Sequence, residues 1–378
     1  MVLIVLAIVV AGAGVFYAQT EMQQRGPLEK GKIVTIKRGM GSGAIARMLE
    51  KEGVISNAGI FMAATYVLRS SNGSLKAGEY QIPASSSMAE VLGILQAGKS
   101  LAYKVTIPEG WTTQNALARI AANKVLKGNI TVKPGEGTLL PDTYVFQRGT
   151  TRDGLIARMQ AAQKKLLDKL WSKRQKNLPI KTRAEAITLA SIVERETGIG
   201  AERPKVAAVF VNRLKKKMRL QSDPTIIYGI VGGKGKMDRP LSKKDIAKKT
   251  RYNTYQIDGL PPTPIANPGR EAIAAVLNPD NIDALYFVAD GSGGHAFAKT
   301  LKGHENNVSN WRKIEHDRRK AAAAKTAASK SDKKATPAKK LLPATKQSAP
   351  VKHPAKPDLA KTPTGKSIPL PPVKPAQN

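Results

Sequence analysis

The chain of 378 residues is long enough for two or three domains, and it contains no cysteine. Disulfides, thiolate metal ligands and a cysteine nucleophile are therefore excluded. None of the four histidines forms an H-x-x-x-H pair, so we predict no metal site.

The formal net charge of +34 is typical of nucleic-acid-binding proteins. The charge is uneven, however, because residues 318–378 contain 15 Lys or Arg against two acidic residues, and 10 of the 24 prolines. A segment of this composition buries too little apolar area to fold, so we predict a disordered tail over residues 318–378. It acts as a solvated spacer or is attracted to anionic lipid or polymer. No module with interleaved aromatic and basic residues accompanies the charge, which argues against nucleic acid as a partner.

Residues 2–18, VLIVLAIVVAGAGVFYA, form an uncharged apolar run. Its length is at the lower limit for a helix that crosses a bilayer. A cleaved signal peptide is the alternative, but the basic region that usually precedes such a peptide's apolar run is absent. We predict a transmembrane anchor at residues 1–18 and a polar linker at 19–31. Without a basic flank, charge leaves the orientation in the membrane open.

A strand–turn–helix pattern occurs twice. In the first copy, IVTI at residues 33–36 predicts a strand, the glycines of residues 39–43 a turn, and the apolar spacing of residues 45–49 a helix. The second copy is KVTIPEGWTTQNALARIA at residues 104–121. This is a common element used twice, or the first copy belongs to a module that resembles LysM, a glycan-binding domain, around residues 32–80.

A helix with two terminal acids is predicted near the middle of the chain. Thr182 and Glu185 fit a capping box, so the helix begins at Arg183. At 100° per residue, Glu196 falls within the stripe of Leu189, Ile192 and Val193, whereas Glu194 lies about 160° away, and Ser191 faces a polar side. An ionised carboxylate in an apolar setting is unfavourable, so Glu196 must find a partner or have a raised pKa.

Two interpretations of Glu196 follow. A carboxyl group that stays protonated near neutral pH suits a general acid in glycosidic cleavage. Alternatively, the helix ends at Gly198, and Glu196 emerges at the surface or pairs with Arg195 or Arg203. Geometry alone favours the second interpretation.

Five long blocks stand out in chain order: GTLLPDTYVF (137–146), LASIVERETG (189–198), ERPKVAAVFVNRLKKKMRLQSDPTIIYG (202–229), YNTYQIDGLPPTPIANPGREAI (252–273) and YFVADGSGGHAF (286–297). Together they resemble the endolytic murein transglycosylase (YceG-like) family. The resemblance implies an α+β fold with a transmembrane helix, a LysM-like module at residues 32–103 and an α+β catalytic domain at 104–317. It also implies a single-pass protein of the bacterial inner membrane with its catalytic domain in the periplasm. The basic tail is not part of the family pattern.

The resemblance also implies a reaction. The family has its essential glutamate in the E-R-E segment, and the R-E-T triplet is similar to the R-E-S setting of lysozyme-like transglycosylases. This selects Glu196 as the catalytic residue, with Glu194 as the fallback. The expected reaction is non-hydrolytic cleavage of the β-1,4 bond between N-acetylmuramic acid and N-acetylglucosamine in nascent peptidoglycan, which leaves 1,6-anhydro ends and limits strand elongation. It needs no cofactor. Cell-wall synthases are possible further partners, and a non-catalytic peptidoglycan-binding scaffold is the alternative function.

Five polar residues are predicted to contact the substrate, because they lie in segments rich in Gly and Pro, where rigid loops present side chains. They are Gln221, Asp223, Asn253, Tyr255 and His295. Each has a structural alternative: Asp223 before Pro224 shapes a turn, for example, and Asn253 caps a loop. His295 has the strongest individual case, because the two preceding glycines permit close backbone approach.

Overall fold

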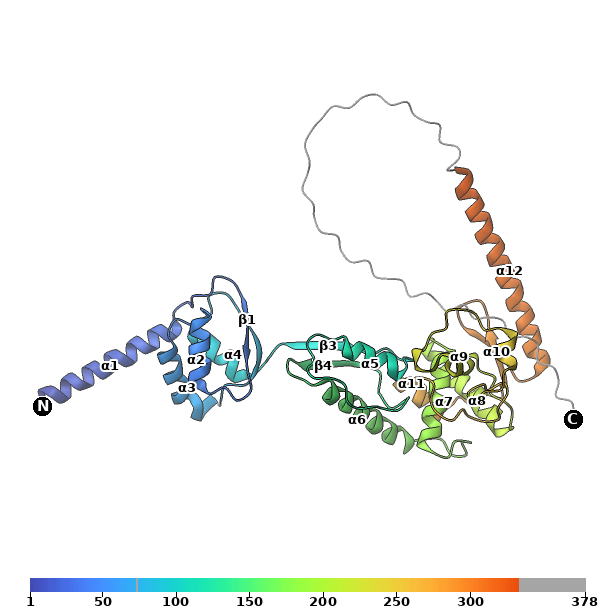
Figure 1. The fold of residues 1–378 in the computed structure, drawn as a ribbon, viewed down its shortest axis with the longest axis horizontal. Helices are drawn as coiled ribbons and strands as arrows, with labels where there is room; N and C mark the ends of the chain where they lie inside the picture. Colours follow the sequence, from blue (N-terminus) through green and yellow to red (C-terminus); the bar gives the residue numbers. More distant parts are fainter. Residues whose placement is uncertain (73, 333–378) are drawn as a thin grey trace, which may run out of the picture. The chain divides into compact units, whose positions relative to one another are not determined.

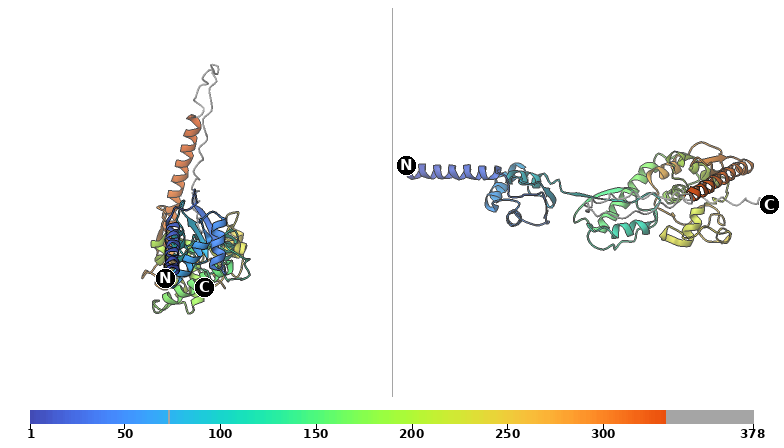
Figure 2. Two further views of the ribbon diagram at one scale, coloured as in Figure 1. Left: turned by 90° about the vertical axis from the view of Figure 1, so that its left-hand side faces the viewer. Right: turned by 90° about the horizontal axis from the view of Figure 1, so that it is seen from above.

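The computed structural model describes residues 1–72 and 74–332. The chain divides into two compact units, Met1–Lys164 and Lys165–Asn378. Both units mix helices with small two-stranded antiparallel sheets, which confirms the predicted combination of helices and strands (Figures 1 and 2).

The first unit starts with a long helix and continues with short strands and helices. Its elements are α1 (Val2–Gln23), β1 (Lys32–Ile36), α2 (Ser42–Lys51), α3 (Ala58–Asn72), β2 (Gly78–Ile82), α4 (Met88–Ala97), β3 (Ala102–Thr106), α5 (Thr113–Ala121), β4 (Thr143–Gln147) and α6 (Arg152–Trp171), whose last turns lie beyond the unit's end.

Helix α1 is long and apolar enough to cross a membrane, a property that it shares with signal sequences. It contains the apolar run of the predicted anchor and continues for five residues into the predicted linker, because no Gly or Pro occurs between Gly14 and Gly26. Its last turns contact the rest of the unit. Met22 packs against the core of the following module, and the Ser56 hydroxyl donates a hydrogen bond of 2.7 Å to the Glu21 carboxylate.

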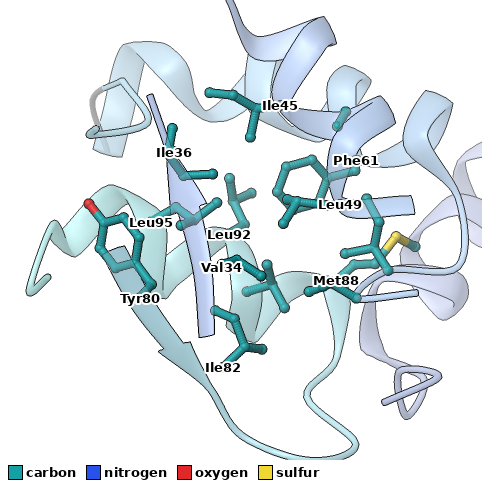
Figure 3. Close-up of a cluster of buried hydrophobic side chains, with 14 of the residues drawn as sticks. Val34, Ile36, Ile45, Leu49, Phe61, Tyr80, Ile82, Met88, Leu92 and Leu95 are labelled. Carbon is teal, nitrogen blue, oxygen red and sulfur yellow. The ribbon is translucent and has the colours of Figure 1, made fainter. Parts of the chain in front are cut away.

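The module after α1 folds around the antiparallel pair β1–β2. Successive side chains of β1 point to opposite faces of the sheet, and this alternation decides which of them enter the core. Val34 and Ile36 are buried, whereas Ile33, which directly precedes Val34, is 51% exposed. Helices α2, α3 and α4 complete this core, in which Figure 3 shows Val34 and Ile36 close to Phe61 and Leu92. Both predicted strand–turn–helix units are present, as β1–α2 and β3–α5.

A second core in the first unit lies between β3, β4, α5 and α6, where side chains such as Ile107, Ile120 and Phe146 are buried. The boundary predicted at residue 104 stays a prediction. The carboxylate of Glu79 on β2 accepts hydrogen bonds from the Tyr103 hydroxyl and from Arg148 on either side of the β3–β4 pair. These bonds connect the module to the strands that follow it.

The second unit contains the remaining helices and one small sheet. Its elements are α7 (Arg183–Glu196), η1 (Gly200–Glu202), α8 (Arg203–Lys215), α9 (Asp223–Val231), η2 (Gly232–Lys234), α10 (Lys243–Ala247), α11 (Arg270–Leu277), β5 (Tyr286–Ala289), β6 (His295–Ala298) and α12 (Leu301–Asp332). Helices α7, α8 and α11 pack against one another, and α12 packs against the β5–β6 pair.

The C-terminal region differs from its prediction at the start of the tail. Residues 318–332 were predicted to be disordered but continue helix α12, because Ala and Lys are strong helix formers and no proline occurs between Leu301 and Pro337. Arg318 also donates a hydrogen bond to the carbonyl of Gly291. The remainder of the predicted tail, residues 333–378, lies outside the described residues.

Candidate active site

Helix α7 begins at Arg183, as the sequence predicts. The side chain of Thr182 accepts a hydrogen bond from the backbone N–H of Glu185, and the Glu185 carboxylate accepts one from the backbone N–H of Thr182, a reciprocal capping box. The helix ends at Glu196, with Thr197 in extended conformation. Every residue from Ala186 to Val193 is buried. Helix α7 is therefore a central helix, and its last turn carries two acids out of an apolar core.

The complete burial of α7 corrects one detail of the prediction. Ser191 was expected on a polar side, but it is fully buried. Its hydroxyl donates to the carbonyl of Thr188 and accepts from the backbone N–H of Ile265, which comes from a loop far along the chain. The helix period cannot reveal such a partner, so Ser191 was assigned to a polar side of the helix.

Glu194 belongs to an ion-paired group. Its carboxylate accepts a hydrogen bond of 2.9 Å from Arg203 Nη2 and another of 2.9 Å from the backbone N–H of Gly269. The Arg203 guanidinium also binds Glu271 at 2.7 Å. Glu194 and Arg203 have side chains that are only 5% and 8% exposed. This group joins α7, α8 and α11 and leaves Glu194 surrounded by structural partners.

Glu196 lies in a different setting. Its carboxyl group accepts a hydrogen bond from the Ser222 hydroxyl, and Arg203 pairs with Glu194 instead of with Glu196. Burial raises the pKa of Glu196 to about 7, and the charge of nearby Asp223 acts in the same direction. The Ser222 hydrogen bond and the charges of Arg213 and Arg195 lower it, but by less than burial raises it. The interpretation in which Glu196 pairs with Arg203 is therefore wrong, and the carboxyl group is set up to hold a proton near neutral pH.

Ser222 is held in place by a network of buried hydroxyl groups. The Thr254 hydroxyl accepts from the backbone N–H of Ser222 at 2.9 Å, and the Thr225 hydroxyl donates to the Ser222 carbonyl at 2.6 Å. The residue before it, Gln221, has a φ of +54°, a left-handed conformation that is unfavourable for a residue other than glycine. The backbone N–H of Gln221 donates to the Thr254 carbonyl at 3.1 Å, which helps to hold this conformation.

Arg213 connects the predicted residues to the core. Its Nη1 donates to the carbonyl of Leu220 at 2.9 Å and to Gln221 Oε1 at 3.2 Å, and its Nε donates to the carbonyl of Leu285 at 2.7 Å. Burial lowers the pKa of Arg213, while the nearby groups of Tyr286, Tyr255 and Glu196 raise it. The side chain thereby positions the loop that carries Ser222 and adds a positive charge near Glu196.

Asp223 and Tyr255 form the other polar pair of the site. The Tyr255 hydroxyl donates a hydrogen bond of 2.8 Å to Asp223 Oδ1. Burial raises the pKa of Asp223, and the hydrogen bond from Tyr255 partly offsets this effect. Burial and the charge of Asp223 also raise the pKa of Tyr255. The structure thus brings Gln221, Asp223 and Tyr255 together around Glu196.

The other two predicted contacts lie elsewhere. Asn253 is fully buried, and its amide donates to the carbonyls of Asp245, Ile246 and Lys248. We assign it this structural role in place of the predicted substrate contact. His295 is paired with Glu202 through its backbone N–H at 2.9 Å and its ring Nδ1 at 2.7 Å. It belongs to a second polar group, on β6 and η1.

Sequence reasoning missed Ser222 and Arg213. Arg213 stands on a helix with Val206, Val209 and Phe210, one or two turns before it, so the argument that found Glu196 also applies to Arg213. For Ser222, no local pattern reveals the partner.

Among residues 1–72 and 74–332, no group of three or more His, Cys, Asp or Glu side chains is placed to hold a metal ion.

These features define a mixed helix-and-strand protein with one protonatable carboxyl group at the end of a buried helix. Residues 34–310 match the model of the YceG-like family, and the chain belongs to that family.

Curated relatives extend this result. The chain is 33% identical over 331 residues to the endolytic murein transglycosylase of Bacillus subtilis, covering 78% of this chain and 89% of the relative. It is 32% identical to the endolytic murein transglycosylase of Streptococcus pneumoniae D39, covering 81% of this chain and 63% of that longer protein. A crystal structure of a YceG-like protein from Listeria monocytogenes is also similar, with 31% identity, a TM-score of 0.44 and coverage of 74% of this chain and 99% of the other.

Proposed function

We propose that this protein is a lytic transglycosylase that cleaves the β-1,4 bond between N-acetylmuramic acid and N-acetylglucosamine inside peptidoglycan strands. The curated relatives named endolytic murein transglycosylase support the reaction class. The observation that carries the proposal is the carboxyl group of Glu196, whose pKa is raised to about 7 by burial. A carboxyl group with such a pKa is present in both protonation states at neutral pH, as acid–base catalysis requires.

In the proposed reaction, Glu196 acts twice. As an acid, it gives its proton to the glycosidic oxygen, and the bond to C1 of the muramoyl residue breaks. As a carboxylate, it then accepts the proton of the muramoyl C6 hydroxyl while that oxygen bonds to C1 and closes the 1,6-anhydro ring. No water is consumed, and Glu196 ends the cycle protonated. One carboxyl group suffices because the nucleophile belongs to the substrate, whereas hydrolases use a pair of carboxyl groups.

The groups around Glu196 are proposed to set its proton affinity and position. Ser222 holds the carboxylate form by hydrogen bonding, and Asp223 disfavours it by like charge. Asp223 is occupied by the Tyr255 hydroxyl, which supports a role in tuning Glu196. Gln221 stays a proposed substrate contact. Its amide oxygen accepts a hydrogen bond from Arg213, which holds the side chain in place beside Ser222.

His295 also stays a proposed substrate contact. Its Nδ1 interacts with Glu202, an arrangement that orients the ring and directs Nε2 away from that carboxylate. A replacement of His295 by Ala is expected to weaken glycan binding more than it slows the chemical step, which a separation of KM from kcat measures.

The first unit is proposed to place the enzyme at the cell wall. Helix α1 would span the inner membrane once, with the rest of the first unit and the second unit in the periplasm. The order β1–α2–α3–β2, with its antiparallel strand pair, supports the proposal that the module is LysM-like and binds glycan. Release of glycan strands beside the membrane would limit their elongation and would bring the enzyme close to cell-wall synthases.

The test is the mass of the products from purified peptidoglycan. A lytic transglycosylase leaves anhydro ends, whereas a hydrolase leaves reducing ends that are heavier by one water. A zymogram on the same substrate tests the alternative of a non-catalytic scaffold, which gives no clearing. Reducing ends contradict the proposed reaction, and an inactive but glycan-binding protein contradicts enzymatic function.

A further inference from the structure

Over residues 58–67, helix α3 presents apolar side chains both to the module core and to the outside. Toward the module core it presents Ala58, Phe61 and Thr65, and the Thr65 hydroxyl is satisfied by the carbonyl of Phe61 at 2.8 Å. On the opposite side of the helix, residues follow one another at intervals of three or four positions along the chain. These exposed positions are Gly59, Met62, Ala63, Tyr66 and Val67. No charged or strongly polar residue occurs among them.

The exposed side chains of α3 are large. Met62 is 47% exposed, Val67 71% and Tyr66 80%. A helix that packs on one side against a core normally carries charged and polar residues on the other side. An apolar outer face is instead typical of a surface that contacts a membrane or another protein. The segment Ala58–Val67 is also one of the short apolar helices of the chain.

The position of α3 indicates the membrane as its partner. Helix α3 contacts the C-terminal end of α1, as both Figure 1 and Figure 2 show. The Ser56 hydroxyl, two residues before α3, binds the Glu21 carboxylate, and Met22 packs into the module. At about 1.5 Å per residue, Glu21 lies only about 5 Å beyond Ala18, the last residue of the apolar run. If α1 crosses the bilayer, α3 starts at its surface.

Basic residues border this apolar face. The Met62 sulfur and the Arg47 guanidinium both lie beside Gly43 of α2. Arg47 is exposed, and so is Arg25, two residues after the end of α1. Arginine at the edge of an apolar face matches anionic lipid headgroups, to which it can reach while its aliphatic part stays on apolar surface. Tyr66 has the amphipathic ring that is enriched at the membrane–water interface.

We infer that helix α3 lies in the membrane interface, with Met62, Tyr66 and Val67 at the boundary between headgroups and acyl chains and Arg47 at anionic headgroups. This inference rests on the proposed membrane anchoring by α1. It gives the module a second point of attachment beside α1. A single spanning helix leaves the module free to rotate, whereas two points fix which of its sides faces the glycan layer.

The natural absence of cysteine permits a direct test on the full chain. We would prepare three single-cysteine variants, Tyr66→Cys on the α3 face, Val9→Cys inside α1, and Thr35→Cys as a matched control. Thr35 is exposed on β1, which Figure 1 shows on the side of the module away from α1. Each variant carries an environment-sensitive fluorophore and is reconstituted in vesicles of phosphatidylcholine and phosphatidylglycerol. Lipids brominated near the headgroup or deep in the acyl chain serve as quenchers.

The expected result is three different responses. The Val9 label is quenched by deep bromines, the Tyr66 label by shallow bromines, and the Thr35 label by neither. Quenching at Val9 without quenching at Tyr66 overturns the inference and leaves the anchor intact. Absence of quenching at Val9 contradicts anchoring by α1 and the inference with it. A Tyr66 label that is shielded in proportion to protein concentration, and insensitive to bromines, identifies the face as a contact between two copies and also overturns the inference.

Discussion

Two carboxyl groups on helix α7, only two residues apart, occupy opposite environments. The Glu194 carboxylate is bound by the Arg203 guanidinium and the backbone N–H of Gly269, both at 2.9 Å. The Glu196 carboxyl group has the hydroxyl of Ser222 as its partner and the negative charge of Asp223 nearby. Both residues are of intermediate exposure, so exposure alone does not distinguish them. Compensation of the charge does: a paired carboxylate holds helices together, and an uncompensated one binds a proton.

The two environments depend on each other. Arg203 binds Glu194 of α7 and Glu271 of α11 from the first residue of α8. These three helices pack against one another. The structural acid thus helps to hold α7, which carries the proposed catalytic acid, in its place.

The largest expected effect comes from Glu196→Gln. The amide keeps the size of the side chain but has no titratable proton, so cleavage should fall by about 10²–10⁴-fold, the usual contribution of a positioned acid–base group. The measurement is the rate of anhydro-product release from purified peptidoglycan. Normal cleavage by Glu196→Gln together with an inactive, folded Glu194→Gln would exchange the two roles and make Glu194 the catalytic acid.

The second prediction concerns stability and Glu194. In Glu194→Gln the Arg203 charge loses its buried partner, and breaking a buried ion pair typically costs about 3–5 kcal/mol of unfolding free energy. Glu271→Gln is the matched control, because it removes the other carboxylate from the same guanidinium. The Glu271 side chain is 64% exposed, so its loss should cost less than about 1 kcal/mol. Chemical denaturation measures both variants, and equal losses would show that burial of the pair is irrelevant.

The sequence predicted this comparison only in part. The capping box gave the start of α7, and the helix period placed Glu196 in the apolar stripe and Glu194 away from it. These are local signals, carried by residues within a few turns of each other. The partners could not be predicted, because Gly269 and Ser222 reach α7 from distant loops. Residues without a visible partner were therefore misassigned.

Ser191 and Asn253 show the consequence of that limit. Ser191 was assigned to a polar side of the helix and is buried against the loop at Ile265. Asn253 was predicted to contact the substrate, with the capping of a loop as the alternative, and it binds carbonyls around α10. In both cases a polar side chain was read as available for solvent or ligand. Arg213 could have been predicted from the helix period, because it lies on the same helical face as apolar residues, as Glu196 does.

The third prediction is a pH dependence of stability. Folding raises the pKa of Glu196 from 4.5 to about 7, so the folded state binds this proton more tightly than the unfolded state. The wild type should therefore lose stability as pH rises from about 4.5 to about 7, by up to about 3 kcal/mol. Glu196→Gln lacks this loss. The free energy of unfolding of Glu196→Gln should therefore rise relative to that of the wild type over this pH range and stay higher at pH 8. Chemical denaturation at pH 4, 6 and 8 measures the difference. Parallel curves for the two proteins would mean that Glu196 titrates alike in both states.

The smallest expected effect is a displacement of the pH–activity profile, in opposite directions for two neighbours of Glu196. Ser222→Ala removes the hydrogen bond that favours the carboxylate, so the pKa of Glu196 should rise further. Asp223→Asn removes the like charge that disfavours the carboxylate, so the pKa should fall. Since the acid form is the one that protonates the glycosidic oxygen, the alkaline limb of kcat should move to higher pH in Ser222→Ala and to lower pH in Asp223→Asn. Glu271→Gln, which touches the Glu194 group alone, should leave the limb in place. A shift in the same direction for both neighbours would show that they act through general disruption of the site, whereas opposite shifts assign the alkaline limb to Glu196 itself.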